Sequence, residues 1–572
     1  MKENESLPNT ETTTFEIALT TIDTPVDGAD EAASATTTAA AADIVKIPLE
    51  KPQFILVFVG LLLAVFLTGL DQSITSTALK AIIEDFGRQD LVSWIGSSYL
   101  LASAGSGTLY GKLADIFGRK SALVFAVCVF ELGSIISGIS KSMIGLIVGR
   151  AISGVGGGGI LPLVMIVITD IVSLRDRGKY QGMIGGIAGI SAIIAPLIGG
   201  AITDSGNWRW CFFLNLPFGF LKFPSEKGSF VEKILRIDFY GAFFLVAAIF
   251  CLLTPLQLGG STWNWNSGQT IGMLVASVVL LVIFIYIELR VAKEPIVPAA
   301  IFANSSVPGL LAIFATLGCG MISGTYFISL FFQVVFGATA TQGGVATIPT
   351  MVGLMITMIV SGIIVSKTGK YMIFFYVGPV ILAVGIGFIS ILSKNSTEAV
   401  KIIYLFIFGL GCGTMLQVRA LAIQASVPLH LLAIVTAAGP TFNTLGGSIG
   451  VAIVGTIFNN VMANWIAGAR ELEEFINKFA SNGISVDSSD TLQILELLQS
   501  SVGGYPVGNV TEAAIYNATL ANATSQLIDG FTHAFNLAYL CLLVAPAVIL
   551  VVAVAFVRQF DMGGGGKSAE WH

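Results

Sequence analysis

Four ionisable side chains stand inside stretches that are otherwise apolar: Asp71, Glu131, Arg150 and Arg419. A charge inside such a stretch is costly and is usually retained for a function. Burial in a low dielectric disfavours the ionised form of a carboxyl group, so Asp71 could load and release a proton. Asp71 and Arg150 are therefore candidates for coupling or gating, with a structural ion pair or a helix cap as the plainer alternative.

Groups for bond-breaking chemistry or metal binding are scattered along the sequence. The three histidines form no constellation, and no Cys-x-x-Cys pair suggests a zinc site or a disulfide framework. We therefore expect no enzyme, no metal and no cofactor. The six cysteines all fall in apolar stretches, where they read as small packing residues: Cys128, Cys211, Cys251, Cys319, Cys412 and Cys541.

A charged decapeptide, Gly-Lys-Leu-Ala-Asp-Ile-Phe-Gly-Arg-Lys, occupies residues 111–120 between two apolar runs. Its glycines allow two helix ends to approach, and its acid can cap a helix or pair with a base. Such a segment could act as a latch between two states of a transporter. A plain basic loop with a tight turn is the other interpretation. The residues that would form the latch are Gly111, Asp115, Gly118, Arg119 and Lys120.

Composition limits what can position these residues. Of 572 residues, 54% are hydrophobic and 11% are charged, whereas soluble domains carry about 25% charged residues. A water-soluble fold cannot hide that much apolar surface, which excludes a soluble enzyme. The net charge of −6 does not suggest a nucleic-acid partner.

Fourteen apolar runs follow one another, and a bilayer requires about 20 residues of helix. The sequence therefore predicts an all-α integral membrane protein. Residues 1–50, rich in Thr, Ala and acids, predict a disordered tail, and residues 558–572 a second tail. The predicted spans are 54–79, 91–110, 121–139, 143–170, 179–203, 209–224, 239–258, 269–290, 308–336, 341–366, 371–393, 401–424, 434–459 and 533–557.

Basic residues orient these spans. With both termini in the cytoplasm, the inner loops and tails hold 19 Lys or Arg and the outer loops hold 8. Cytoplasmic loops carry the excess of basic residues, so both termini are predicted to be cytoplasmic. Residues 460–532 then form an outer loop, with short amphipathic helices expected in it. Glycan acceptors in outer loops agree with this topology and with a eukaryotic secretory pathway: Asn395, Asn509, Asn517 and Asn522.

The decapeptide resembles the loop 2–3 signature of the major facilitator superfamily. Other stretches resemble its fourteen-span drug:proton antiporter branch, of the fungal toxin and multidrug efflux type, and the likeness covers roughly residues 54–560. One is similar to that branch's antiporter motif, although Ala195 replaces a glycine before the proline. The stretches are 70–80, 149–158, 170–182, 208–217 and, for the antiporter motif, Gly189, Pro196, Gly199 and Gly200. In this last stretch, a kinked packing helix is an equally simple interpretation.

The resemblance implies two six-helix halves, 54–224 and 308–557, separated by a linker and two extra helices in 225–300. It also implies that Arg150 takes part in proton coupling. Three further residues are candidates for a substrate cavity: Glu131, Gln333 and Arg419. Glu131 could instead pair with a base, Gln333 could be a packing contact, and Arg419 could bind an anionic group, form a salt bridge or extend to the interface.

The predicted function is proton-coupled export of small amphipathic molecules, drugs or secondary-metabolite toxins, by alternating access. The expected partners are a small-molecule substrate, protons and lipid. The alternative is a vacuolar transporter of basic amino acids or siderophores from the same superfamily. The plasma membrane is expected, with the vacuolar membrane as the alternative. Gly-Gly-Gly-Gly-Lys-Ser at 563–568 resembles part of an ATP-binding loop, but Asp561 occupies the position of its first glycine, so no ATP is expected.

Overall fold

The computed structural model describes most of the chain between residues 51 and 559, and its secondary structure there is helical. Residues 49–572 belong to one compact unit. Apart from one isolated bridge between Gly259 and Trp263, the described residues contain helices, turns and bends. The described ranges are 51–87, 91–215, 238–259, 263–292, 294–338, 340–468 and 510–559.

The helices of the first part of the chain follow the predicted apolar runs closely. α5 and α6 each begin after a capping serine; for example, the Ser142 hydroxyl accepts from the backbone N–H of Gly145 at the start of α5. These helices are α2 (Lys51–Phe86), α3 (Val92–Phe117), α4 (Arg119–Ile139), α5 (Met143–Ile171), α6 (Leu174–Asp204) and the short α7 (Trp210–Phe213).

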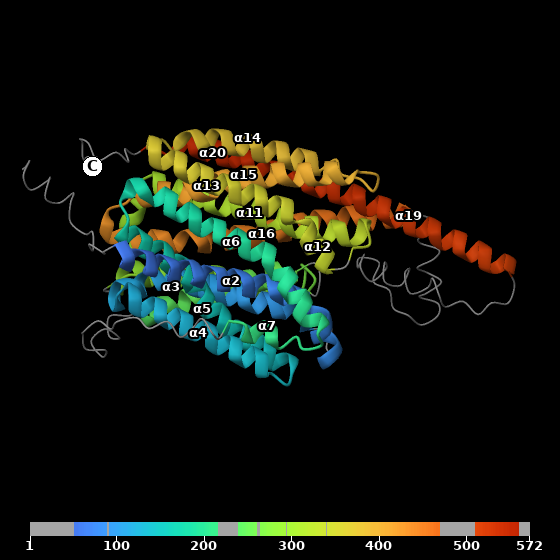
Figure 1. Cartoon of the computed structure of the whole chain (residues 1–572), viewed down its shortest axis with the longest axis horizontal. Helices are drawn as coiled ribbons and strands as arrows, with labels where there is room; N and C mark the ends of the chain where they lie inside the picture. Colours follow the sequence, from blue (N-terminus) through green and yellow to red (C-terminus); the bar gives the residue numbers. More distant parts are fainter. Residues whose placement is uncertain are drawn as a thin grey trace, which may run out of the picture. The chain divides into compact units, whose positions relative to one another are not determined.

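The middle and last parts of the chain continue the same pattern (Figure 1). Short 3-10 turns precede α11, α16 and α20: η3 (Ala299–Phe302), η4 (Leu429–Leu431) and η6 (Cys541–Leu543). The helices are α9 (Phe239–Leu258), α10 (Gly268–Arg290), α11 (Ser306–Val335), α12 (Ala340–Ala346), α13 (Ile348–Thr368), α14 (Met372–Ile389), α15 (Glu398–Ala425), α16 (Leu432–Gly468), α19 (Val510–Leu540) and α20 (Val544–Phe556).

Within the described residues, 12 helical segments are long and apolar enough to cross a membrane. The prediction of a helical multi-pass membrane protein is therefore confirmed, but fourteen spans are not established. Two predicted spans are missing from this set. Span 91–110 forms α3, whose serines and threonines lower its hydropathy and face other helices rather than lipid. Of span 209–224, the described residues show only the four-residue α7, and 216–237 lie outside the description.

The outer loop predicted over 460–532 is shorter in the structure. α16 continues to Gly468 and α19 already begins at Val510, so both helices extend beyond the predicted spans. The short amphipathic helices expected in the middle of this loop fall on residues 469–509, outside the described residues. The predicted tail 1–50 also lies outside them, and so do residues 560–572 of the predicted tail 558–572.

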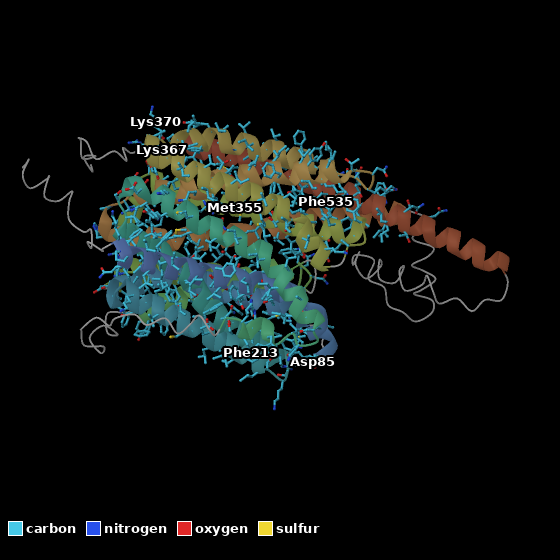
Figure 2. The ribbon with its side chains drawn as sticks, viewed as in Figure 1. Asp85, Phe213, Met355, Lys367, Lys370 and Phe535 are labelled. Atoms are coloured by element: carbon cyan, nitrogen blue, oxygen red, sulfur yellow. The ribbon has the colours of Figure 1, made fainter. Side chains whose placement is uncertain are left out.

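Apolar side chains pack into clusters that largely separate the early helices from the late ones. One cluster draws all its buried members from residues 301–557, and two others draw nearly all of theirs from 58–214. α9 and α10 pack against each other, and α9 also contacts α3 and α16. The early and late groups meet along two seams, α6 against α13 and α3 against α16. Figure 2 places Lys367 and Lys370 at one end of the helices and Asp85 at the opposite end.

Candidate functional site

A buried ion pair lies at the centre of the early group of helices. Arg150 Nη1 on α5 donates to Asp71 Oδ2 on α2 over 2.6 Å, and the two side chains are 2% and 0% exposed. The other carboxylate oxygen accepts from Asn215 Nδ2 at 3.3 Å. Both oxygens of Asp71 thus have donors. A structural ion pair was the plainer alternative to a role in coupling or gating, and the structure contains a pair of these two residues, while the coupling role stays a prediction.

Aromatic rings surround the guanidinium. The Arg150 Cζ atom lies 4.6 Å from the ring centroid of Tyr99 and 5.8 Å from that of Phe212. A desolvated guanidinium is stabilised by aromatic faces. Gln72 Nε2 also approaches the Tyr99 hydroxyl at 3.5 Å. The pair is therefore enclosed by side chains from α2, α3 and α7.

Glycines allow α4 and α5 to approach closely beside this pair. A Cβ on Gly133 would lie 2.1 Å from the backbone nitrogen of Ser153, and one on Gly149 would lie 2.7 Å from that of Ser137. Small residues at such crossings permit close helix packing within a membrane. The glycines that follow Arg150 meet backbone in the same way: a Cβ on Gly154 would lie 2.4 Å from the carbonyl oxygen of Tyr99, and one on Gly156 would lie 2.3 Å from the backbone nitrogen of Phe130.

Glu131, on α4, is buried near the pair without joining it. Its side chain is 8% exposed, and neither carboxyl oxygen has a hydrogen-bond partner within the described residues. The salt bridge between Glu131 and Arg419, one of the alternatives above, is not formed, because Arg419 contacts Phe314 instead.

The decapeptide forms the junction of α3 and α4 and a charge network beside it. Gly118 has φ +88°, a backbone conformation that glycine adopts without strain, and it lets the chain turn directly from one helix into the next. Arg119 donates to Asp115, and its Nε donates to Asp170 Oδ2 at 2.8 Å. The network therefore ties α3, α4 and the end of α5 together. Lys120 is the second residue of α4 and is half-buried.

Two other residues of the decapeptide reach beyond the early helices. A Cβ on Gly111 would lie 2.9 Å from the carbonyl oxygen of Ala433 on α16, so only glycine allows this approach of the two groups. Lys112 Nζ lies 3.1 Å from Glu294 Oε2 in the segment after α10. We call the end of the helices that carries this decapeptide the loop 2–3 end. The charge bias of the sequence predicts it to be cytoplasmic.

The seam between α6 and α15 near the loop 2–3 end holds a buried amide network. Gln181 Nε2 donates to Gln424 Oε1 at 2.9 Å, and Gln417 Nε2 donates to Gln181 Oε1 at 3.1 Å. All three side chains are at most 2% exposed. Lys179 adds a backbone N–H bond to Ser366 Oγ at 3.1 Å on α13. These bonds join the early and late helices at the loop 2–3 end.

The stretch expected to resemble an antiporter motif lies in α6, which remains helical through Pro196. A Cβ on Gly189 would come within 3.3 Å of Met355 Cβ on α13, so this glycine belongs to the α6–α13 seam, where Figure 2 labels Met355. Gly199 is buried, whereas Gly200 has open space around it. Gly189 thus serves a close helix approach, and Gly200 has no such contact.

Comparison with known proteins identifies the family. Residues 61–223 match the family model described as Major Facilitator Superfamily. The MFS-type efflux pump MFS1 of Arthroderma benhamiae is 34% identical over 460 residues, which cover 76% of this chain and 86% of that protein. The chain belongs to the major facilitator superfamily. Members of this family are transporters and not enzymes, as the sequence predicted.

Further members of the superfamily agree. The efflux pump dotC of Dothistroma septosporum is 36% identical over 426 residues, covering 73% of each chain. The efflux pump aflT of Aspergillus parasiticus is 34% identical over 426 residues, covering 72% of this chain and 83% of the pump.

Among solved structures, two members of known fold are similar. A bacterial homologue of the human lysosomal transporter Spinster, in an inward-facing and unoccupied conformation, has a TM-score of 0.52 at 16% identity and covers 89% of this chain and 98% of its own. The human organic anion transporter MFSD10 has a TM-score of 0.51 at 14% identity, covering 70% and 93%. At these identities the likeness shows the fold, which is the major facilitator fold.

The cavity candidates of the late helices, Gln333 and Arg419, have different neighbours. Arg419, on α15, is 3% exposed, its Nη1 donates to the carbonyl oxygen of Phe314 at 3.1 Å, and its Cζ lies 4.1 Å from the Phe314 ring centroid. Gln333 is half-buried on α11 and bonds within its own helix, to Ser329. Arg419 and Gln333 therefore occupy separate places, and a shared cavity for the three candidates stays a prediction.

Two of the predicted glycan acceptors have described side chains, and both are exposed. Asn395 lies in the turn between α14 and α15, and Asn522 lies on α19. Asn517 also lies on α19, although its side chain is outside the description, and Asn509 lies outside the described residues. Exposure is necessary for modification, so these sites remain predictions.

Several site residues were missed by sequence reasoning. Asn215 binds Asp71, Asp170 binds Arg119, and Gln181 links two groups of helices. The signal that could have found them is the rule applied above to charges, because amides within apolar stretches are also costly when unpaired. Asn215 and Gln181 lie in predicted spans.

Proposed function

We propose that this protein is a proton-coupled exporter of small amphipathic molecules, such as drugs or secondary-metabolite toxins, that works by alternating access. The early and late groups of helices are the two moving halves. The relatives named above are called efflux pumps in three fungal species, which supports export over uptake.

The observation that carries this proposal is the buried pair of Asp71 and Arg150. A carboxylate that is 0% exposed and held by two donors can be neutralised only when the site opens to water. A proton on Asp71 would remove its attraction for Arg150 and release the helices that the pair joins, α2 and α5. Proton binding and a change of conformation are then linked through one bond.

The available energy is sufficient for export. One charge that crosses 100 mV supplies about 2.3 kcal/mol, and each pH unit adds about 1.4 kcal/mol. Since about 1.4 kcal/mol corresponds to a tenfold ratio, one proton can sustain a gradient of a few hundredfold under both forces.

The loop 2–3 end supplies the closure that alternating access requires. In this conformation the decapeptide network, the amide network and the seams at Gly111 and Lys179 hold that end together. We assign the plasma membrane as its location, since export from the cell requires it, and place both termini in the cytoplasm.

Arg419 gives the proposed substrate site its preference for anions. Within the described residues no carboxylate pairs with this buried guanidinium, and its Nε has no partner there. A charge-assisted hydrogen bond contributes about 1.5–3 kcal/mol. Arg419→Gln is therefore expected to lower export of an anionic dye such as fluorescein about tenfold and to leave export of a cationic rhodamine unchanged, as measured by dye retention in cells.

Lys401→Gln is the control for this prediction, because it removes another buried base from the same helix. Lys401 is already paired with Glu398 and lies near the other end of α15. Unchanged export of fluorescein by Arg419→Gln would remove Arg419 from the substrate site.

The experiment that tests the proposed function compares cells with and without the protein, each with and without a protonophore, for retention of rhodamine and fluorescein. Export requires lower retention in cells that express the protein, and proton coupling requires that the protonophore abolish the difference. A difference that survives the protonophore contradicts proton coupling. Depletion of basic amino acids from the vacuole of cells without the protein would instead support the uptake alternative.

A further inference from the structure

Glu131 stands apart from two paired acids of the early helices, buried Asp71 and half-buried Asp170. Asp71 accepts two hydrogen bonds and Asp170 accepts one from Arg119, whereas both oxygens of Glu131 lack a donor within the described residues. Only 8% of Glu131 is exposed, so water cannot replace the missing donors over most of its surface.

The place of Glu131 within the helices is central. By residue count it lies about 18 Å along α4 from the start of the helix at Arg119, at a rise of about 1.5 Å per residue, and so well inside the apolar span. One turn further on, Ser134 Oγ accepts from Asn215 Nδ2 at 3.4 Å, the amide that also binds Asp71. Glu131 therefore borders the site of the ion pair.

The charged groups around Glu131 decide its protonation. α2 contributes Asp71, which interacts with Glu131 electrostatically and repels a second negative charge. α5 contributes Arg150, the base that is bonded to Asp71. The other charged groups on helices packed against α4 are Lys112 and Asp115 on α3 and Asp170 on α5, and all three are engaged in ion pairs at the loop 2–3 end. Tyr99 and Tyr110 on α3 and Cys211 on α7 complete the titratable groups on these helices.

An ionised Glu131 would be strongly unfavourable in this setting. A buried carboxylate without donor or counter-charge costs several kcal/mol, and a second one beside Asp71 adds repulsion. Burial of the neutral acid costs far less free energy, because the neutral acid loses only the hydrogen bonds that it would make in water. We propose that Glu131 is a second proton-binding site, which holds a proton while Arg150 is paired with Asp71. For its part in transport, this inference rests on the proposed function.

The two acids share one base, which makes their protonation states exclusive. When Asp71 takes up a proton from water, Arg150 loses its anionic partner, and its unpartnered Nε is available to another acid. Glu131 then releases its proton to water and becomes that partner. The site holds one proton on two carboxyls before and after this exchange, and its net charge stays at zero. In this exchange Arg150 changes its ionic partner from Asp71 on α2 to Glu131 on α4. Proton uptake therefore changes which helices the arginine joins.

Infrared spectroscopy of the purified full-length protein in lipid nanodiscs tests the inference directly, because a protonated carboxyl has a C=O stretching band that a carboxylate lacks. The wild type and Glu131→Gln are compared at neutral pH without substrate. The expected result is loss of a protonated-carboxyl band in Glu131→Gln. Glutamine matches the size and neutrality of the protonated acid, so the fold should persist. An unchanged band overturns the proposal.

Glu398→Gln is the matched control, since it makes the same chemical change at a carboxyl whose side chain is 80% exposed. It should leave the protonated band unchanged and reduce the carboxylate bands instead. Loss of the protonated band in this variant would also contradict the assignment.

A second spectrum tests the exchange. In Asp71→Asn the arginine has no partner on α2, so Glu131 should ionise and its protonated band should disappear. A Glu131 band that persists in Asp71→Asn overturns the exchange. These spectra need no transport. If the protonophore leaves dye export unchanged, proton coupling is contradicted. The assignment of the proton to Glu131 is tested separately, by the spectra.

Discussion

Asp71→Asn is expected to abolish proton-driven export while the protein still reaches the membrane. The asparagine keeps the size of the side chain and can still accept from Asn215, but it can neither ionise nor bind a proton. Arg150 remains in place without its counter-charge. Retention of dye by cells that express the variant should equal retention by cells without the protein.

The same substitution should lower stability. Removal of one partner from a buried ion pair costs about 3–5 kcal/mol, because it leaves the other charge uncompensated. Thermal unfolding of the purified variant should therefore begin at a lower temperature than that of the wild type. An ionised Glu131 could offset part of this loss, so Asp71→Asn combined with Glu131→Gln should be less stable than either single variant.

A double variant separates the electrical role from the structural one. Asp71→Asn with Arg150→Gln removes both charges and should recover much of the stability, because no unpaired charge remains. It should still fail to respond to a proton gradient. If Asp71→Asn or the double variant exports dye at the wild-type rate under a proton gradient, the pair is only structural.

Hydropathy predicted which residues form the helices much better than it predicted which side of each helix is buried in the protein. On α4, Phe130 is 1% exposed and Leu132 is 51% exposed, although both are apolar. In a membrane the lipid-facing and the core-facing surfaces have the same composition, so the periodicity that marks the inside of a soluble helix is weak. α3 was also predicted as a span, but its serines and threonines keep it below the hydropathy of the other spans, and three of them are buried, Ser98, Ser106 and Thr108.

The candidate site was predictable where charge stood alone in an apolar run. Asp71 and Arg150 were each singled out as a charge within an apolar run, but that reasoning did not name them as partners across the 79 positions that separate them. The contact of Gln181 with Gln424 spans 243 positions. Amides can bond to many partners, so this contact required the three-dimensional arrangement of α6 and α15.

The second large effect is expected at Gly362, where α13 crosses α6 near the loop 2–3 end. A Cβ on Gly362 would lie 2.2 Å from the carbonyl oxygen of Gly178, and a Cβ on Gly178 would lie 2.6 Å from that of Gly362. Both obstacles are backbone atoms, so no side chain can rotate away. Gly362→Ala must push the two helices apart.

Separation at this point would weaken the bonds nearby, from Lys179 to Ser366 and from Gln181 to Gln424. Overpacking of this kind costs about 1–3 kcal/mol. Because the strain exists only while the loop 2–3 end is closed, the cost shifts the equilibrium toward the conformation open at that end, by about 5- to 150-fold. Export should fall because the closed conformation is rarely reached.

Distances between spin labels at Lys179→Cys and Lys370→Cys measure this shift, in a background where the exposed Cys128 and Cys541 are replaced. Gly362→Ala should move the distance distribution to longer values. The control is Gly387→Ala on α14, which adds the same methyl group where no atom lies within 4 Å of the new Cβ. It should keep the wild-type distribution. A backbone clash of this size cannot be absorbed without movement of the helices. If Gly362→Ala and Gly387→Ala nevertheless give equal distance distributions, the contact between Gly178 and Gly362 does not hold this end closed.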